Sequence, residues 1–433
     1  MLLFVESESD FKQLCDSLSS GSAFFQFIYD EKIHSTKNKP VALFIYQLET
    51  ESTFVLSFSH PDVVPISYSC IRTLTKTSSK KYIVDKKECM YFTNLSEFVD
   101  ISFDVYTKTL NQVKIKYPSC NDLRSLPIYT IKKSFDDTLK FFKYYIGKES
   151  PCNVKLLNDL CTAFSLIENH GLVVDRSEFK LGDVNLIDDK NKIFSQYNYF
   201  TPTTRPSNRF AKINFAALNK KKNEKDCFVS RYNNKGGLVM FDYESYHLRL
   251  FAEHINFNLP TSSLHEYFGK FYHNKDTLTE EEYEMSKKIT FNLIFGGISA
   301  DVQSHIPFMK KVAEYVEENW KKFQTEGYIE TWKYKRVLSS EHYKEMNPYK
   351  LFNYLLQAAE TERNCIMINK IHNLLDGKKS KLVLYHYDAF LLDMHRSEFI
   401  LAKQLSELLS EQNKYPVRMY VGSNYGNMTE FKV

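Results

Sequence analysis

The sequence predicts an α+β protein of two or three domains. Short runs of β-branched and aromatic residues dominate about the first 120 positions, whereas apolar residues at helical spacing dominate from Pro127 onward. A chain of 433 residues exceeds what one hydrophobic core usually supports. Its 43% hydrophobic and 25% charged residues are typical of a folded, soluble protein.

The N-terminal region contains four predicted strands. They cover residues 24–29, 41–46, 53–58 and 82–84, and turn-forming residues separate the first three. We expect these strands to form a domain that spans residues 1–122.

Helices are predicted for much of the remaining chain. The strongest patterns cover residues 156–168, 308–323, 351–375 and 399–409. Their ends carry stop and start signals, such as Pro307 before one helix and a glycine after two others. A further short strand is predicted at residues 417–421.

Composition limits the class of protein and its compartment. The formal net charge of +4 permits a nucleic-acid groove but does not require one. The eight cysteines are scattered without a CxxC pair, so neither a structural zinc nor a disulfide framework is indicated. The N-terminus has no basic leader, and no apolar run approaches the ~18–20 residues of a membrane span. We expect a cytoplasmic protein, in the host cytoplasm if it is viral.

Two aspartates far apart in the sequence each follow a strand-like apolar run. Asp242 ends residues 238–242 (LVMFD), and Asp388 lies within residues 382–392 (LVLYHYDAFLL). An aspartate at the end of a strand is usually a cap or an exposed turn residue. A lone buried carboxylate is costly without a cation, however, and a divalent metal shared by both aspartates explains the two acids together.

A helix-spaced row of one cation and two aromatic residues lies between these aspartates. Lys287, Phe291 and Phe295 are four residues apart, and Gly296 follows. Such aromatic stripes usually pack in a core, but here a lysine that can hold a triphosphate begins the row and a helix-breaking glycine ends it. Two metal-binding carboxylates and such a lysine are the minimum apparatus for adding nucleotides to a nucleic-acid chain.

Several segments, in this order, resemble the family A DNA polymerases, the DNA polymerase I type, and especially their compact bacteriophage members. Residues 166–179 resemble the link from thumb to palm. The others are 201–208 (TPTTRPSN), 241–250 (FDYESYHLRL), 287–297 (KKITFNLIFGG), 350–364 (KLFNYLLQAAETERN) and 384–393 (LYHYDAFLLD). The resemblance covers roughly residues 150–433. It implies a right-hand polymerase, with thumb and connection at 123–200, palm and fingers at 201–433, and fingers at about 255–335.

The resemblance also implies catalytic roles for matching residues. Asp242 and Asp388 would bind two Mg²⁺ ions (or Mn²⁺), with the backbone carbonyl of Tyr243 as a further ligand. Lys287 would hold the triphosphate, and His265 would be a second phosphate contact.

Other matching residues would contact the base, the sugar and the DNA. Phe291 would stack near the nucleotide sugar and base, and Phe295 would lie beside the templating base. Arg205, Asn353 and Gln357 would contact the minor groove of the primer-template, whose acceptors are common to all base pairs.

Three positions depart from the family pattern. Tyr283 replaces an arginine one turn before Lys287, so the phosphate grip needs another source, such as Lys288 or His265. Ala389 replaces the acid that usually follows the second aspartate. His247 replaces the glutamate that crowds the sugar 2′ position, and because a histidine could donate to a 2′-hydroxyl we expect weaker exclusion of ribonucleotides.

The N-terminal region is similar in strand order to the family's RNase H-like 3′–5′ exonuclease domain. The active nuclease needs a D-x-E pair on its first strand, but here Lys32 stands two residues after Asp30. We therefore expect a vestigial exonuclease-type domain without proofreading. Glu49 and Glu51 are an alternative acidic pair in a different frame.

Lys220, Lys221 and Lys222, with Lys225 nearby, form the one strong cluster of positive charge in the sequence. They would either contact duplex phosphates or form a solvated loop, and the sequence favours neither.

Two other functions compete with a DNA polymerase. A single-subunit RNA polymerase shares the two aspartates and the lysine helix, and His247 favours it mildly. A non-catalytic DNA-binding replication protein is the third possibility. For a polymerase, the expected partners are primer-template DNA, dNTPs and a processivity factor or other replication proteins.

Overall fold

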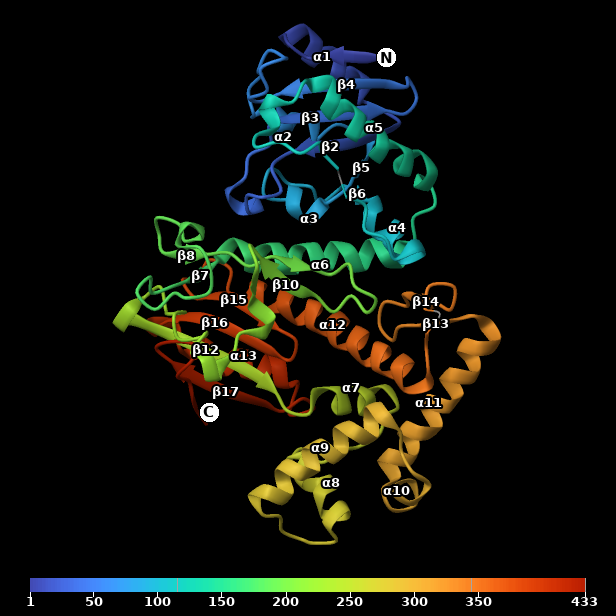
Figure 1. Ribbon diagram of the computed structural model, residues 1–433, viewed down its shortest axis with the longest axis vertical. Coiled ribbons are helices and arrows are strands. Elements are labelled where there is room, and N and C mark those ends of the chain that lie inside the picture. Colours follow the sequence, from blue (N-terminus) through green and yellow to red (C-terminus); the bar gives the residue numbers. More distant parts are fainter. Residues whose placement is uncertain (115, 344, 433) are drawn as a thin grey trace. The chain divides into compact units, whose positions relative to one another are not determined.

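The computed structural model describes residues 1–114, 116–343 and 345–432 (Figure 1). The chain divides into two compact units, Met1–Asn169 (unit 1) and His170–Val433 (unit 2). The narrower domain bounds expected from the sequence stay predictions. Within the described residues, no helix is both long enough and apolar enough to cross a membrane.

Unit 1 is built on a six-stranded mixed sheet. The strands lie in the order β1-β4-β3-β2-β5-β6, in which β2, β3 and β4 are antiparallel neighbours and β5 and β6 run parallel to β2. The strands are β1 (Leu2–Phe4), β2 (Ser22–Ile28), β3 (Ala42–Gln47), β4 (Ser52–Ser57), β5 (Lys80–Ile83) and β6 (Val99–Asp100). The helices are α1 (Glu8–Ser17), α2 (Cys70–Leu74), α3 (Lys86–Cys89), α4 (Ile101–Thr109), α5 (Ile128–Tyr145) and α6 (Pro151–His170). The four predicted strands are confirmed.

Both faces of this sheet are buried, which explains why its strands read as almost continuous apolar runs. Phe24 and Phe44 face one core, whereas Phe25 and Phe27 face the other. Helix α5 covers the first face, where Phe135 stacks on Phe24 at 5.8 Å between ring centroids.

The sheet also places the acidic residues considered for the N-terminal region. The Glu49 carboxylate accepts a hydrogen bond from the backbone N–H of Ser22, at the start of β2 (2.9 Å), whereas Asp30 follows the far end of that strand. Glu49 and Asp30 therefore lie at opposite ends of β2, and a role for the pair of Glu49 and Glu51 stays a prediction.

Unit 2 contains a five-stranded antiparallel sheet with the order β15-β16-β12-β17-β18. Its strands are β12 (Gly236–Tyr243), β15 (Lys381–His386), β16 (Ala389–His395), β17 (Val417–Gly422) and β18 (Thr429–Glu430). Short strands outside it are β7 (Leu172–Val173), β8 (Lys192–Ile193), β9 (Tyr197–Asn198), β10 (Ser207–Phe210), β11 (Ile213–Asn214), β13 (Tyr328–Glu330) and β14 (Val337–Ser339).

The helices of unit 2 confirm the sequence patterns. They are α7 (Tyr246–His254), α8 (Leu264–His273), α9 (Glu280–Gly296), α10 (Ala300–His305), α11 (Pro307–Glu326), α12 (Pro348–Leu374) and α13 (Ile400–Ser410). Helix α9 begins with a capping box between Thr279 and Glu282 and ends at Gly297, whose φ is +129°. In Figure 1, α8 to α11 form a group apart from the sheet strands, and α12 extends from this group toward β15.

Candidate active site

Strand pairing in unit 2 places Asp242 and Asp388 side by side. In the register of β12 and β16, Asp242 lies opposite Ala389, and the backbone N–H of Tyr243 donates to the carbonyl oxygen of Asp388 (3.0 Å). Asp388 follows Tyr387 in the tight turn between β15 and β16, where Tyr387 has a φ of +55°. The side chain of Asn364, from α12, holds this turn by donating to the Tyr387 carbonyl (2.7 Å).

A buried arginine holds the end of β12 in place. The guanidinium of Arg363 donates to the hydroxyls of Tyr243 (2.8 Å) and Tyr246 (3.0 Å) and lies 3.7 Å from the ring centroid of Tyr415. The rings of Tyr243 and Tyr246 stack at 4.2 Å. These contacts tie β12 and α7 to α12, so the backbone next to Asp242 has little freedom to shift.

A cavity of about 600 Å³ opens at these two aspartates. The sheet, α7, α8, α9 and α12 all contribute to its wall. It gathers nearly all the residues that the sequence singled out, namely Arg205, Asp242, Tyr243, His247, His265, Lys287, Phe291, Phe295, Asn353, Gln357 and Asp388.

The lysine cluster lies outside this cavity. Lys220, Lys221 and Lys222 are exposed on a short 3-10 helix. Lys225 differs from them, because it is only partly exposed, lies 4.4 Å from the ring centroid of Tyr425 and is close enough to lower the pKa of Asp242. Lys225 therefore lies against Tyr425 and apart from the exposed lysines of the cluster.

The two aspartates carry an unfavourable charge arrangement. Burial and, after it, the neighbouring charge of Asp388 raise the pKa of Asp242 to about 7, although the charges of Arg418 and Lys225 act in the opposite direction. Burial, followed by the charge of Glu360, also raises the pKa of Asp388. Both effects would be relieved by a cation between the carboxylates.

This donor set fits Mg²⁺, which is commonly bound by one or two carboxylates together with substrate phosphates. In the described parts of the chain, no group of three or more His, Cys, Asp or Glu side chains is arranged to hold a metal. The candidate metal site therefore consists of this pair of carboxylates, and the Tyr243 carbonyl, implied by the family resemblance, stays a predicted further ligand.

The α9 side of the cavity presents a cation and two aromatic rings. Lys287 donates to Glu284 (2.6 Å), and because the Lys287 side chain is partly exposed and that of Glu284 half exposed, a triphosphate could displace Glu284 at little cost. Phe291 is 51% exposed, which leaves its ring available for stacking. Phe295 lies next along the helix, with its ring 6.1 Å from that of Phe291.

His265 faces the same region as a neutral imidazole. Burial lowers its pKa to about 4, and the charge of Lys287 contributes. Its Nε2 contacts the Ser245 hydroxyl at 3.2 Å, and in the described chain its buried Nδ1 has no hydrogen-bond partner. A neutral ring in this position can exchange a hydrogen bond with a phosphate but adds no charge.

The residues expected to contact DNA line the same cavity from α12 and from the segment that contains Arg205. Gln357 accepts from the Thr203 hydroxyl (3.0 Å) and donates to Asn353 (3.1 Å). The guanidinium of Arg205 lies 3.7 Å from the ring centroid of Tyr387. Each of these side chains is held by a neighbour rather than extended freely into solvent.

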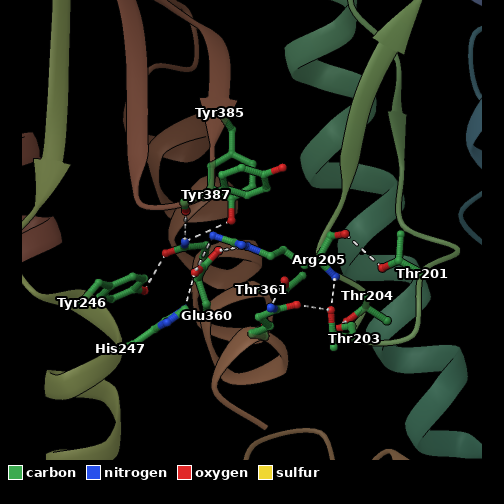
Figure 2. A network of polar contacts seen from close by, with 12 residues as sticks. Thr201, Thr203, Thr204, Arg205, Tyr246, His247, Glu360, Thr361, Tyr385 and Tyr387 are labelled. Atoms are coloured by element: carbon green, nitrogen blue, oxygen red, sulfur yellow. Dashed lines mark hydrogen bonds and ion pairs between the residues drawn. The ribbon is translucent and has the colours of Figure 1, made fainter. Parts of the chain in front are cut away.

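Two charged pairs in the cavity wall were missed by the sequence analysis. Arg418, opposite Asp242 on β17, forms an ion pair with Glu244. Glu360, on α12, binds both Arg205 and His247 (Figure 2). Little in the sequence marks Glu360, because Ala358 and Ala359 precede it but four polar residues follow it, namely Thr361, Glu362, Arg363 and Asn364.

No protein-family model and no curated protein matches the chain. Among solved structures, the POL domain of Pol1 from M. smegmatis, in complex with DNA primer-template and dNTP, is similar with a TM-score of 0.74. The similarity covers 98% of this chain and 99% of that chain at 12% sequence identity. The chain has the fold of a family A polymerase domain. This confirms the polymerase fold that the sequence predicted, whereas the exonuclease-type assignment of the N-terminal region stays a prediction.

We predict that Asp242→Asn raises the melting temperature in metal-free buffer. The pKa of Asp242 is about 7 in the folded protein, against a usual value of 3.8, so the unfolded chain releases its proton first as pH rises. The folded state thus loses stability between about pH 4 and pH 7, and asparagine avoids this loss. The gain measured by thermal scanning should grow from pH 4 to pH 7 and stay constant above.

Asp393→Asn is the matched control in the same sheet. The Asp393 carboxylate accepts from Ser230 (2.7 Å) and Arg231 (2.8 Å), so its loss should lower the melting temperature. A gain for Asp242→Asn that does not vary between pH 4 and pH 8 would contradict the raised pKa.

Proposed function

We propose that this protein is a template-directed DNA polymerase that adds dNTPs to a primer 3′ end. The observation that carries the proposal is the single cavity in which the two aspartates, Lys287 and the minor-groove residues meet, on a polymerase fold. The structural neighbour was solved with primer-template DNA and dNTP, which supports the same partners here.

Asp242, Asp388 and the Tyr243 carbonyl would hold two Mg²⁺ ions, or Mn²⁺. When bound, such ions lower the pKa of the primer 3′-hydroxyl and neutralise the charge of the departing pyrophosphate. The raised pKa values of the two aspartates support this role, because each carboxylate is ionised most favourably when a cation is present.

The α9 residues would bind the incoming nucleotide. Lys287 would exchange Glu284 for the triphosphate, and neutral His265 would add a hydrogen bond to it. Phe291 would stack near the sugar and base, and Phe295 would lie beside the templating base. Closure of this helix over a correctly paired nucleotide would assemble the site, so that pairing geometry controls the rate.

The cavity residues on α12 and in the segment that contains Arg205 would hold the primer-template. Arg205, Asn353 and Gln357 would contact acceptors in the minor groove, which report pairing geometry and not sequence. Lys220, Lys221 and Lys222 would contact duplex phosphates from their exposed turn, in a salt-dependent way.

The wider context is a phage-type replication polymerase in the cytoplasm, assisted by a processivity factor or other replication proteins. Unit 1 would be an exonuclease-type domain of RNase H-like topology. What supports this topology is its sheet, in which three antiparallel strands are followed by two strands parallel to the first.

Primer extension tests the proposed activity. The protein with Mg²⁺ and dNTPs should extend a primer on a longer template, and Asp388→Asn should lower kcat by at least about 10³-fold because one carboxylate of the metal pair is lost. Asp393→Asn, in the same hairpin, should keep measurable activity. Extension with NTPs but not dNTPs would favour the RNA polymerase instead, and template binding without any extension would favour a non-catalytic protein.

Discrimination against ribonucleotides should be weak. The Nε2 of His247 is hydrogen-bonded to Glu360. Within the described residues its Nδ1 makes no hydrogen bond, so a 2′-hydroxyl could bond to that nitrogen. We expect a preference for dATP over ATP of no more than about 10²-fold, the level reached by a pocket without specific exclusion. Single-nucleotide incorporation of both substrates measures it, and a much higher ratio would reject the prediction.

We also propose that proofreading is absent. Asp30 accepts a hydrogen bond from the backbone N–H of Lys32 (2.9 Å), and Lys32 donates its amino group to the Cys120 carbonyl (3.1 Å), so the position of the second acid is occupied by a cation. However, burial and the charges of Asp100 and Glu31 raise the pKa of Asp85 well above its usual value, which shows other acids nearby.

A mismatched primer terminus should therefore remain intact when the protein is incubated with Mg²⁺ alone. Removal of the mismatched nucleotide would contradict this, if Asp30→Asn or Asp85→Asn abolished it and Asp388→Asn did not.

A further inference from the structure

A buried carboxylate links two walls of the cavity. Glu360, on α12, is 1% exposed. Its Oε1 accepts from Arg205 Nε (2.9 Å), and its Oε2 accepts from Arg205 Nη2 (3.3 Å) and from His247 Nε2 (2.6 Å). Figure 2 shows the three side chains converging from different segments of unit 2. One acid therefore holds both His247, which is expected beside the nucleotide sugar, and Arg205, which is expected beside the minor groove of the DNA.

This arrangement requires the charge on Glu360. Burial alone would raise the pKa of its carboxyl, but the hydrogen bond from His247 and the charges of His247 and Arg205 lower it below its usual value. An ionised carboxylate only accepts hydrogen bonds, and removing one partner would leave a buried charge partly unpaired. The geometry of each partner therefore depends on the other.

For His247 the consequence is a fixed ring position. Nε2 must carry its proton toward Glu360, which leaves Nδ1 as the nitrogen that a sugar hydroxyl can meet. The ring also meets Phe295 edge-on, with centroids 6.3 Å apart and planes at 84°. The acid on one side and the aromatic ring on another hold the imidazole in a single orientation.

For Arg205 the consequence is a guanidinium held between a carboxylate and a ring. Two of its nitrogens bind Glu360, and its face lies against Tyr387, the residue before Asp388. Within the described chain, its Nη1 makes no hydrogen bond. That nitrogen is the one available to a base acceptor at the primer terminus.

We propose that Glu360 is a positioning residue that couples recognition of the nucleotide sugar to recognition of the primer terminus. The proposal rests on the proposed polymerase function and adds a specificity determinant to it. A disturbance at Arg205 reaches His247 through the shared carboxylate, and a disturbance at His247 reaches Arg205 in the same way.

This coupling is tested by measuring how a substitution of Arg205 changes nucleotide selection and how a substitution of His247 changes binding of primer-template. Arg205→Ala should change the ratio of dATP to ATP incorporation, and His247→Ala should raise the KM for primer-template. Glu360→Gln should produce both effects, each up to about 10²-fold, because small displacements of positioning groups have effects of that size. Adding His247→Ala to Glu360→Gln should change the ratio little further, since the two changes remove one interaction.

Glu362→Gln is the matched control. Glu362 is as buried as Glu360 on the same helix but accepts from the backbone N–H groups of Lys333 and Tyr334 (3.0 and 3.2 Å), away from the cavity. Its variant should lower thermal stability without changing the nucleotide ratio or the KM for primer-template. Far-UV circular dichroism would confirm that each variant is folded.

The outcomes separate the coupling from the proposed function. If the unmodified protein extends primers but Arg205→Ala leaves the nucleotide ratio unchanged, Glu360 does not couple the two walls. Equal effects of Glu360→Gln and Glu362→Gln would show a role in stability alone. If the unmodified protein extends no primer, the proposed function fails, and the coupling fails with it.

Discussion

The antiparallel pairing of β12 with β16 determines where the chemistry of this protein can take place. It sets Asp242 next to Asp388, although burial and mutual repulsion make that neighbourhood unfavourable for two negative charges. The strands can impose this cost because the pairing extends over seven residue pairs and the end of β12 is tied to α12 through Arg363. A divalent cation between the two carboxylates would remove this repulsion, so the unfavourable pairing would favour metal binding.

The charged groups around the cavity fall into an exchangeable set and a fixed set. Lys287 and Glu284 form an exposed pair on α9, which contributes little stability and can be replaced by substrate. Glu360 with Arg205 and His247 is buried, so replacing any member would leave a charge without its partner. The nucleotide phosphates would thus meet side chains that can rearrange, and the sugar and primer end would meet side chains that cannot.

Much of the architecture could be predicted from local patterns. The strands of unit 1 and the helices α6, α11, α12 and α13 follow hydrophobic periodicity and end signals, which act within a few residues. The site residues could be proposed because each lies in a short segment with its own character, such as the acid in LYHYDAF. The surroundings of Lys225 and of Glu49 could not be predicted, because the exposure of a residue and its neighbours across a sheet depend on distant segments.

The sequence by itself determined which residue types are present, their order, and the helices and strands that carry them. Only the tertiary structure decided that Glu360 lies between Arg205 and His247, that Arg418 stands opposite Asp242, and that His265 is neutral. The reason is physical: hydrophobic periodicity is a property of adjacent residues, whereas burial, ion pairing and pKa depend on groups brought together from remote segments by the sheet register and helix packing.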